Sequence, residues 1–195
     1  MFERTGRKTI ILNIAWGGAA VTNINPSNSW YQDDEVVSLR RIDATREWTA
    51  LLEALKASSI DYELAGMMWV QGEAECARIG AGTLPVQAYT DGTLDAFKYF
   101  RDLTSRPTLP IYMAQIGYYK LAMANPELLG GYEKVRKAQL DLCKEHEKDS
   151  IFMASELPGT YFKAGYMQDN IHYNQRGYNS LGASFARFIS NHQSF

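Results

Sequence analysis

Short apolar runs alternate along this chain with longer stretches that have helical periodicity. Four of the runs are rich in large or β-branched apolar residues and are followed directly by Gly, Gln or Ser, as expected for buried parallel strands. They cover residues 9–16, 67–70, 109–114 and 150–154. We expect each of these runs to form a strand.

The other stretches place apolar residues three and four positions apart, which is the pattern of an amphipathic helix. The predicted helices cover residues 43–57, 87–104, 132–147 and 174–190. Strand–helix alternation predicts a parallel sheet with helices on both faces and right-handed crossovers. No repeat, charge block or linker divides the sequence, so we expect a single domain over residues 1–195.

The composition predicts a soluble globular protein and excludes several classes. With 20 basic and 22 acidic residues, the formal net charge is −2, which argues against general nucleic-acid binding. No apolar run approaches the roughly 18 residues of a membrane span. The run at 9–16 lacks the small-residue cleavage pattern of a signal peptide, and the compartment is left open. Cys76 and Cys143 fit a reducing compartment, although the sequence is also compatible with one bridge between them.

The sharpest local motif is Asp169-Asn170-Ile171-His172, just before the last predicted helix. A carboxylate three residues ahead of a histidine can accept the Nδ1 proton and leave Nε2 free as a general base. The alternative is that Asp169 caps a local turn and His172 is an ordinary polar residue. His146 and His192 lie among polar residues in helical stretches, and we interpret them as surface residues.

A second motif, Trp69-Val70-Gln71-Gly72-Glu73, follows the run at 67–70. The Gln71 amide at the carboxyl end of a strand could donate to a developing oxyanion. Glu73 and Glu75 could instead cap the first turn of the following segment or be solvated, and taken alone the motif favours these alternatives. A third motif, Trp16-Gly17-Gly18, follows the first run and could expose backbone N–H groups to an anion, or form a plain turn.

Together the motifs resemble the SGNH-hydrolase superfamily, and within it the sialate O-acetylesterase-like and acetylxylan-esterase-like carbohydrate esterases. The matching blocks follow the family's order over nearly the whole chain, and W-x-Q-G-E is the most specific of them. They are Ala15-Trp16-Gly17-Gly18, Trp69-Val70-Gln71-Gly72-Glu73 and Asp169-Asn170-Ile171-His172-Tyr173, with support from residues 109–115 and 135–139. The resemblance implies a flavodoxin-like, three-layer α/β/α fold with a parallel sheet.

The resemblance also implies roles for individual residues. His172 would be the catalytic base and Asp169 its orienting acid. Gln71 and a backbone N–H of Gly17 or Gly18 would form the oxyanion hole. Beyond what the resemblance implies, we expect Glu73 and Trp16 to hold the surrounding loops or contact substrate. No metal or organic cofactor is implied. Further aromatic residues that could face a sugar ring are Trp69, Tyr118, Tyr119 and Tyr166.

The family's first strand and its nucleophilic serine are not recognisable in this sequence. That serine occupies a G-x-S or G-Q-S-N turn upstream of the glycine block, where this chain has no serine. Ser27, Ser29 and Ser155 lie outside a strand–turn–helix context. The missing strand would belong between the runs at 9–16 and 67–70, and each buried backbone group left unpaired would cost about 1–3 kcal/mol.

We therefore expect a carbohydrate O-acetylesterase that acts on acetylated carbohydrate and lacks its own nucleophile. A separate N-terminal fragment or another protomer would complete the sheet; the third alternative is a rearranged, non-catalytic sheet. The rival function is an inactive, esterase-derived module with a carbohydrate-binding or structural role. A glycosidase that uses Glu73 with Asp169 would require carboxyl groups roughly 5–9.5 Å apart.

Overall fold

A three-stranded parallel sheet forms the centre of the computed structural model, which describes residues 8–192. The strands are β1 (Met67–Trp69), β2 (Ile111–Ala114) and β3 (Ile151–Ser155), in the spatial order β1-β2-β3. Met67 pairs with Ile111, which in turn pairs with Ile151. The sheet confirms three of the four predicted strands and their parallel direction.

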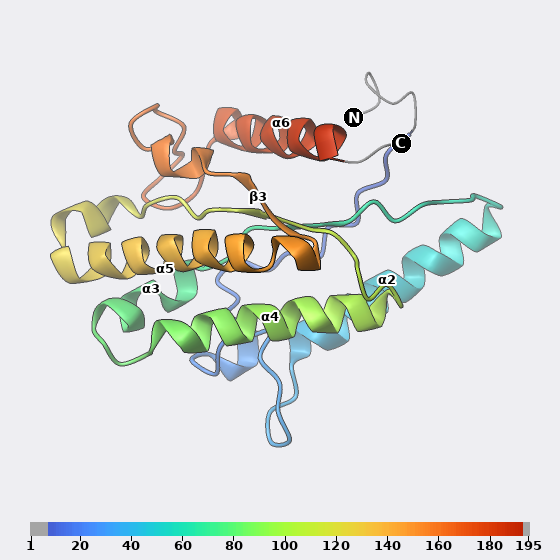
Figure 1. Ribbon diagram of the computed structural model, residues 1–195, viewed down its shortest axis with the longest axis horizontal. Coiled ribbons are helices and arrows are strands. Elements are labelled where there is room, and N and C mark those ends of the chain that lie inside the picture. Colours follow the sequence, from blue (N-terminus) through green and yellow to red (C-terminus); the bar gives the residue numbers. More distant parts are fainter. Residues whose placement is uncertain (1–7, 193–195) are drawn as a thin grey trace.

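Helices cover both faces of this sheet, as the strand–helix alternation predicts (Figure 1). The α-helices are α2 (Leu39–Ala57), α3 (Glu73–Gly80), α4 (Val86–Leu103), α5 (Pro126–Glu145) and α6 (Gln175–His192). Single turns of 3-10 helix occur at η1 (Pro26–Asn28), η2 (Lys120–Ala124), η3 (Glu147–Asp149) and η4 (Leu157–Thr160). The four predicted helices correspond to α2, α4, α5 and α6, but α5 begins six residues and α2 four residues before the predicted start.

Alternate side chains of β2 enter two separate hydrophobic clusters. Ile111 and Met113 point into the larger cluster, where residues of α3, α4 and α5 cover the sheet. Tyr112 and Ala114 point to the opposite face, where they pack in the cluster that includes the apolar residues of α6. The fold is therefore a three-layer α/β/α arrangement, and the two sides are called below the α4/α5 face and the α6 face.

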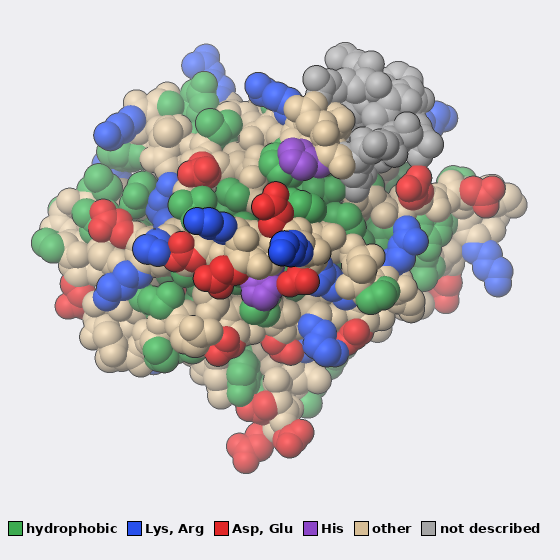
Figure 2. Space-filling model, viewed as in Figure 1, with side chains coloured by type: hydrophobic (Ala, Val, Ile, Leu, Met, Phe, Trp, Pro, Cys, Tyr) green, Lys and Arg blue, Asp and Glu red, His purple; other side chains and the backbone are tan. Residues whose placement is uncertain are grey.

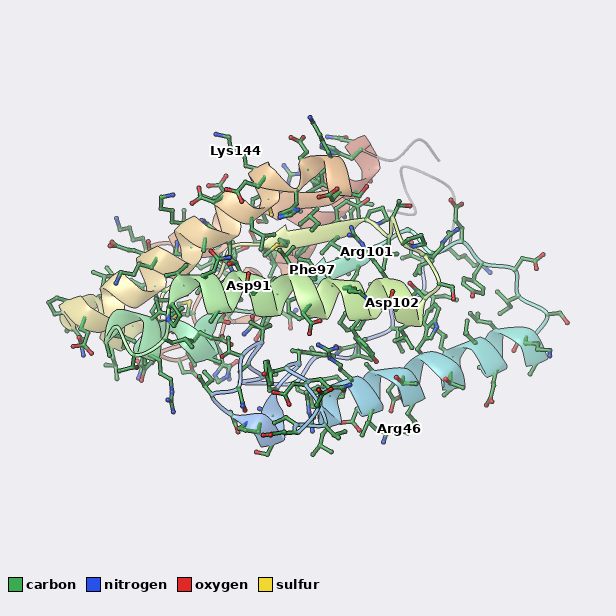
Figure 3. The ribbon with its side chains drawn as sticks, turned by 60° about the horizontal axis from the view of Figure 1, so that its bottom comes forward. Arg46, Asp91, Phe97, Arg101, Asp102 and Lys144 are labelled. Carbon is green, nitrogen blue, oxygen red and sulfur yellow. The ribbon has the colours of Figure 1, made fainter. Side chains whose placement is uncertain are left out.

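On the α4/α5 face, three helices lie side by side, with α4 between α5 and α2 (Figure 3). Phe97 on α4 is 1% exposed, whereas Arg46 on α2 points away into solvent. Acidic and basic side chains are interspersed along the outer surface of α5 (Figure 2). This mixed charge is typical of a solvated helix surface.

The prediction of a strand at residues 9–16 is wrong. These residues are extended, and Leu12, Ile14 and Trp16 are half-buried while the residues between them are exposed, so the alternation of a strand is present. However, the tract pairs with no strand in the described part of the chain. A strand exists only through hydrogen bonds to a neighbour, and the apolar pattern does not specify that neighbour.

Helix α3 lies outside the four helices that the sequence predicts. It has only eight residues, begins after Gly72 and carries Glu73 and Glu75 in its first turn, where carboxylates favour a helix N-terminus. Both cysteines are free and buried, so no bridge joins them. Among the described helices, none combines the length and the apolar character needed to cross a membrane.

Candidate functional site

Asp169 holds His172 in a single orientation on an exposed loop. The Asp169 Oδ2 atom lies 2.8 Å from the His172 Nδ1 atom, and Oδ1 accepts from the backbone N–H groups of Ile171 and His172, at 2.8 Å each. The carboxylate thereby fixes both the loop and the ring. His172 Nε2 makes no hydrogen bond within the described residues, and its side chain is 66% exposed. An imidazole held in this way can take a proton from a partner at Nε2.

These same hydrogen bonds lower the pKa of Asp169 to about 2. The largest cause is the backbone N–H of His172, followed by that of Ile171 and by the His172 ring. A carboxylate that accepts several hydrogen bonds is stabilised in its charged form. Asp169 is therefore ionised throughout the neutral pH range and can stabilise a positive charge on His172.

The Gln71 amide lies in a buried network rather than in open solvent. Its Nε2 donates to the Ala19 carbonyl oxygen at 3.0 Å and to Glu75 Oε2 at 2.9 Å. Glu75 Oε1 accepts from Val21 N at 2.7 Å, which ties the loop after the glycine turn to α3. Both Nε2 hydrogens are thus occupied, and an oxyanion would have to displace one acceptor. The Gln71 Oε1 atom is buried and has no donor in the described chain.

The sequence offers Glu75 only as a helix cap or a solvated residue and does not reveal that it is buried. It is fully buried, and burial raises its pKa in spite of its hydrogen bonds to Val21 and Gln71. Its position four residues after Gln71 is the only local signal of its hydrogen bond with the Gln71 amide. The contact with Val21 joins residues 54 positions apart, so no local pattern could have predicted it.

Glu73 lies where three segments meet at the carboxyl end of the sheet. It lines a narrow crevice, too tight to hold a water molecule, with residues of the loop after β2, of α5 and of the loop that carries His172, namely Gly117, Tyr118, Tyr119, Tyr132, Ile171 and Tyr173. Tyr173 accepts from Gly117 N at 3.0 Å, and Lys120 N donates to Asn170 O at 2.7 Å. Burial, and then the charge of Glu75, raise the pKa of Glu73.

The glycine turn presents two free backbone donors. Gly17 and Gly18 are exposed, and their N–H groups make no hydrogen bond within the described residues. Gly18 has a φ of +69°, a conformation that favours glycine. Asn28 Nδ2 donates to the Gly17 carbonyl oxygen at 3.0 Å and so fixes the turn. One side of Trp16 is covered by the Arg40 guanidinium, 4.8 Å from the ring centroid.

With this geometry established, comparison with known proteins identifies the family. The family model described as "Carbohydrate esterase, sialic acid-specific acetylesterase" matches residues 2–191. The chain belongs to this family. Neither the search of the curated proteins nor the search of the solved structures found a match. Membership of this family supports hydrolase chemistry in general.

Two further residues, both on α5, position the loops of the candidate site. Gln139 is fully buried; its Nε2 donates to the Gln71 carbonyl oxygen at 2.8 Å, and its Oε1 accepts from Ile116 N at 3.0 Å. It thereby joins the carboxyl ends of β1 and β2. The Arg136 guanidinium donates to Ile116 O and packs 4.8 Å from the Tyr118 ring centroid.

The serines considered from the sequence are engaged elsewhere. Ser29 is 1% exposed and donates to the Ala20 and Thr22 carbonyl oxygens at 3.2 and 2.9 Å. Ser27 bonds to Asn25 on the exposed loop, and Ser155 Oγ accepts from Leu157 N at 3.4 Å. Within the described part of the chain, no serine hydroxyl bonds to His172. In the same region, no group of three or more His, Cys, Asp or Glu residues could hold a metal ion.

Proposed function

We propose that this protein is a serine-type carbohydrate O-acetylesterase in which His172 is the general base and Asp169 orients it. The nucleophilic serine comes from a segment outside the described residues. The observation that carries the proposal is the Asp169–His172 pair: the ring is fixed through Nδ1 at 2.8 Å, while Nε2 is unoccupied and exposed. The family match to a carbohydrate esterase supports the reaction class.

The reaction would proceed through an acyl-enzyme. The serine oxygen attacks the acetyl carbonyl carbon while His172 Nε2 takes the hydroxyl proton. The negative charge that forms on the carbonyl oxygen accepts hydrogen bonds from the free N–H groups of Gly17 or Gly18. The sugar oxygen then leaves and takes the proton from His172. Water attacks the acyl carbon in turn while His172 takes its proton, and acetate is released when the serine oxygen leaves and recovers that proton.

Gln71 is proposed as a further oxyanion donor. Its Nε2 would have to break the 3.0 Å hydrogen bond to the Ala19 carbonyl oxygen and donate to the oxyanion instead. Its second hydrogen bond, to Glu75, would keep the side chain in place. A donor of this kind contributes about 10²–10³-fold to kcat. Glu73 and its tyrosine neighbours, at the carboxyl end of the sheet, would contact the sugar part of the substrate.

The test is hydrolysis of p-nitrophenyl acetate by the chain combined with a serine-bearing segment from a family member. His172→Ala should abolish turnover, and Gln71→Ala should lower kcat by roughly 10²–10³-fold. A matched control exists within the chain, because His146 Nδ1 lies 2.8 Å from Asp149 Oδ2 but precedes β3, at the opposite end of the sheet. His146→Ala should leave the rate unchanged; equal losses from both histidine variants would refute the assignment.

The second candidate function is an inactive module derived from such an esterase. It is favoured by one observation, the absence of any serine bonded to His172 in the described residues. This candidate predicts that the chain binds an acetylated glycan but releases no acetate when the serine-bearing segment is added. Acetate release that depends on His172 would exclude it.

A further inference from the structure

The peptide group between Gly17 and Gly18 is held on one side by a single side chain. Asn28 Nδ2 donates to the Gly17 carbonyl oxygen at 3.0 Å. In a trans peptide group, the C=O and the N–H point in opposite directions. The N–H of Gly18 therefore points away from Asn28, and it makes no hydrogen bond within the described residues.

The peptide group between Ala19 and Ala20 shows what lies on the side away from Asn28. Its N–H donates to the Asn28 carbonyl oxygen at 3.0 Å, and its C=O accepts from Gln71 Nε2, also at 3.0 Å. The side of the turn that faces away from Asn28 is therefore the side of Gln71. The free N–H of Gly18 points to that same side, where the Gln71 amide is already a donor.

Two conformations are open to the turn that contains this peptide group. Ala19 N donates to the Trp16 carbonyl oxygen at 3.4 Å, which closes a four-residue turn with the two glycines in the middle. Gly18 has a positive φ, +69°, and Gly17 does not, as in a type II turn. A type I turn closes the same hydrogen bond with the middle peptide group rotated by about half a turn, and glycine tolerates both. The two glycines themselves therefore do not select the observed conformation.

The Asn28 side chain makes the selection. Rotation of the middle peptide group would place the Gly18 N–H, instead of the Gly17 carbonyl oxygen, opposite Asn28 Nδ2, so that two donors would face each other. Asn28 is the last residue of η1, and its backbone is fixed, because its N–H donates to Asn25 O at 2.9 Å and its carbonyl oxygen accepts from Ala20 N. A hydrogen-bonded loop thus presents the amide that orients the turn.

We propose that Asn28 is a positioning residue: by holding the Gly17 carbonyl oxygen, it keeps the Gly18 N–H directed toward Gln71 as a donor to an anion, the oxyanion of the ester reaction. The inference rests on the proposed function and deepens it, since it assigns to Gly18 a role that the turn alone offers to two glycines. The hydrogen bond from Asn28 also polarises the peptide group, which strengthens its N–H as a donor.

The first test observes the turn directly, by NMR of the isotope-labelled whole chain. In the type II turn the Gly17 Hα protons lie next to the Gly18 amide proton, whereas in the rotated form the two amide protons lie next to each other. We expect the parent to show the strong Hα–amide cross-peak. Asn28→Ala should show both forms, and Asn28→Asp mainly the rotated form, because a carboxylate accepts hydrogen bonds and donates none. Unchanged cross-peaks in both variants would refute the proposal.

The second test asks whether the Gly18 N–H faces an anion. Acetate, the product of the proposed reaction, is titrated into the same samples, and the amide signals of both glycines are followed. We expect a saturable shift of the Gly18 signal in the parent. Acetate should bind about three- to tenfold more weakly to Asn28→Ala, the range for the loss of one ordinary hydrogen bond. A larger shift at Gly17 than at Gly18, or no saturable shift at either, would overturn the assignment.

The third test measures activity in the chain combined with the serine-bearing segment. Asn28→Ala should lower kcat for p-nitrophenyl acetate by about three- to tenfold and leave KM unchanged, because the ester is neutral and the negative charge forms only in the transition state. The matched control is Asn25→Ala, since the Asn25 side chain lies on the same loop and accepts from Ser27 Oγ at 3.1 Å, not from the glycine turn. Equal losses of kcat in both variants, or a rise in KM alone, would argue for a general effect of the loop and refute the positioning role.

The outcomes separate this inference from the proposed function. If the turn rotates in Asn28→Asp and acetate shifts the Gly18 signal, but the combined protein releases no acetate from the ester, the proposed function is wrong and the role of Asn28 at an anion-binding turn stands. If acetate is released in a His172-dependent way while Asn28→Ala leaves kcat unchanged, the function stands and the inference is wrong.

Discussion

Two adjacent glycines on α5 provide a sharp test of how this helix fits against α3. A Cβ added to Gly130 would meet nothing within 4 Å. A Cβ added to Gly131 would overlap the Cys76 carbonyl oxygen and lie 2.9 Å from its carbonyl carbon and 3.0 Å from Gly80 N. The obstacles at Gly131 are backbone atoms of α3, so no side-chain rotation relieves them.

The two substitutions should change the free energy of unfolding in opposite directions. Gly130→Ala should stabilise the protein by up to about 1 kcal/mol, because alanine is the better residue in a helix interior. Gly131→Ala gains the same preference but must push α3 and α5 apart, and overpacking of this kind costs about 1–3 kcal/mol or more. For a chain of this size, 1 kcal/mol shifts Tm by roughly 2–4 °C.

The assay is thermal and urea unfolding of the two variants beside the parent protein. Because α3 begins at Glu73 and carries Glu75, a displaced α3 should also disturb the contact between Glu75 and Gln71. We therefore expect Gly131→Ala, but not Gly130→Ala, to lower esterase activity in the complemented protein. Equal stabilisation by both substitutions would refute the close contact between α3 and α5.

Two further predictions concern the buried polar groups of the site. Glu75→Gln places an amide where the carboxylate accepts from Val21 N and Gln71 Nε2, and should lower the free energy of unfolding by about 1–3 kcal/mol. Burial raises the pKa of Glu75 above 4.5, so the parent protein loses stability as pH rises and this carboxyl group becomes charged. In urea unfolding from pH 4 to 8, the free energy of unfolding should therefore decline less in Glu75→Gln than in the parent. The same decline in both proteins would contradict this. Tyr173→Phe leaves Gly117 N without its acceptor and should cost about 1–3 kcal/mol in the same assay, whereas Tyr178→Phe, at a tyrosine that is 50% exposed, should cost little.

The features predicted well from the sequence are those that depend on neighbours in the chain. The Asp169–His172 contact spans three residues, and the structure shows it at 2.8 Å. Strands β2 and β3 come from short apolar runs that alternate with helical stretches, which is the usual sequence pattern of an α/β protein. The long helices α4 and α6 are amphipathic, so their periodic apolar residues specify both the helix and its buried side.

The features missed depend on contacts between distant segments. Glu75 joins Val21 across 54 residues, and Gln139 joins Gln71 across 68. A charged or polar residue in a helix gives no local sign that it will be buried, since most such residues are exposed. Sequence analysis assigned Gln71 to the site, but could not show that the Ala19 carbonyl oxygen occupies one of its N–H groups.

The wrong prediction of a strand at residues 9–16 has a physical cause. Apolar alternation sets which side of an extended segment faces the core, and in this tract it does so, because Ile14 and Trp16 pack inward. Pairing is a separate requirement, since every buried backbone N–H and C=O needs a partner. The tract meets the first requirement and not the second.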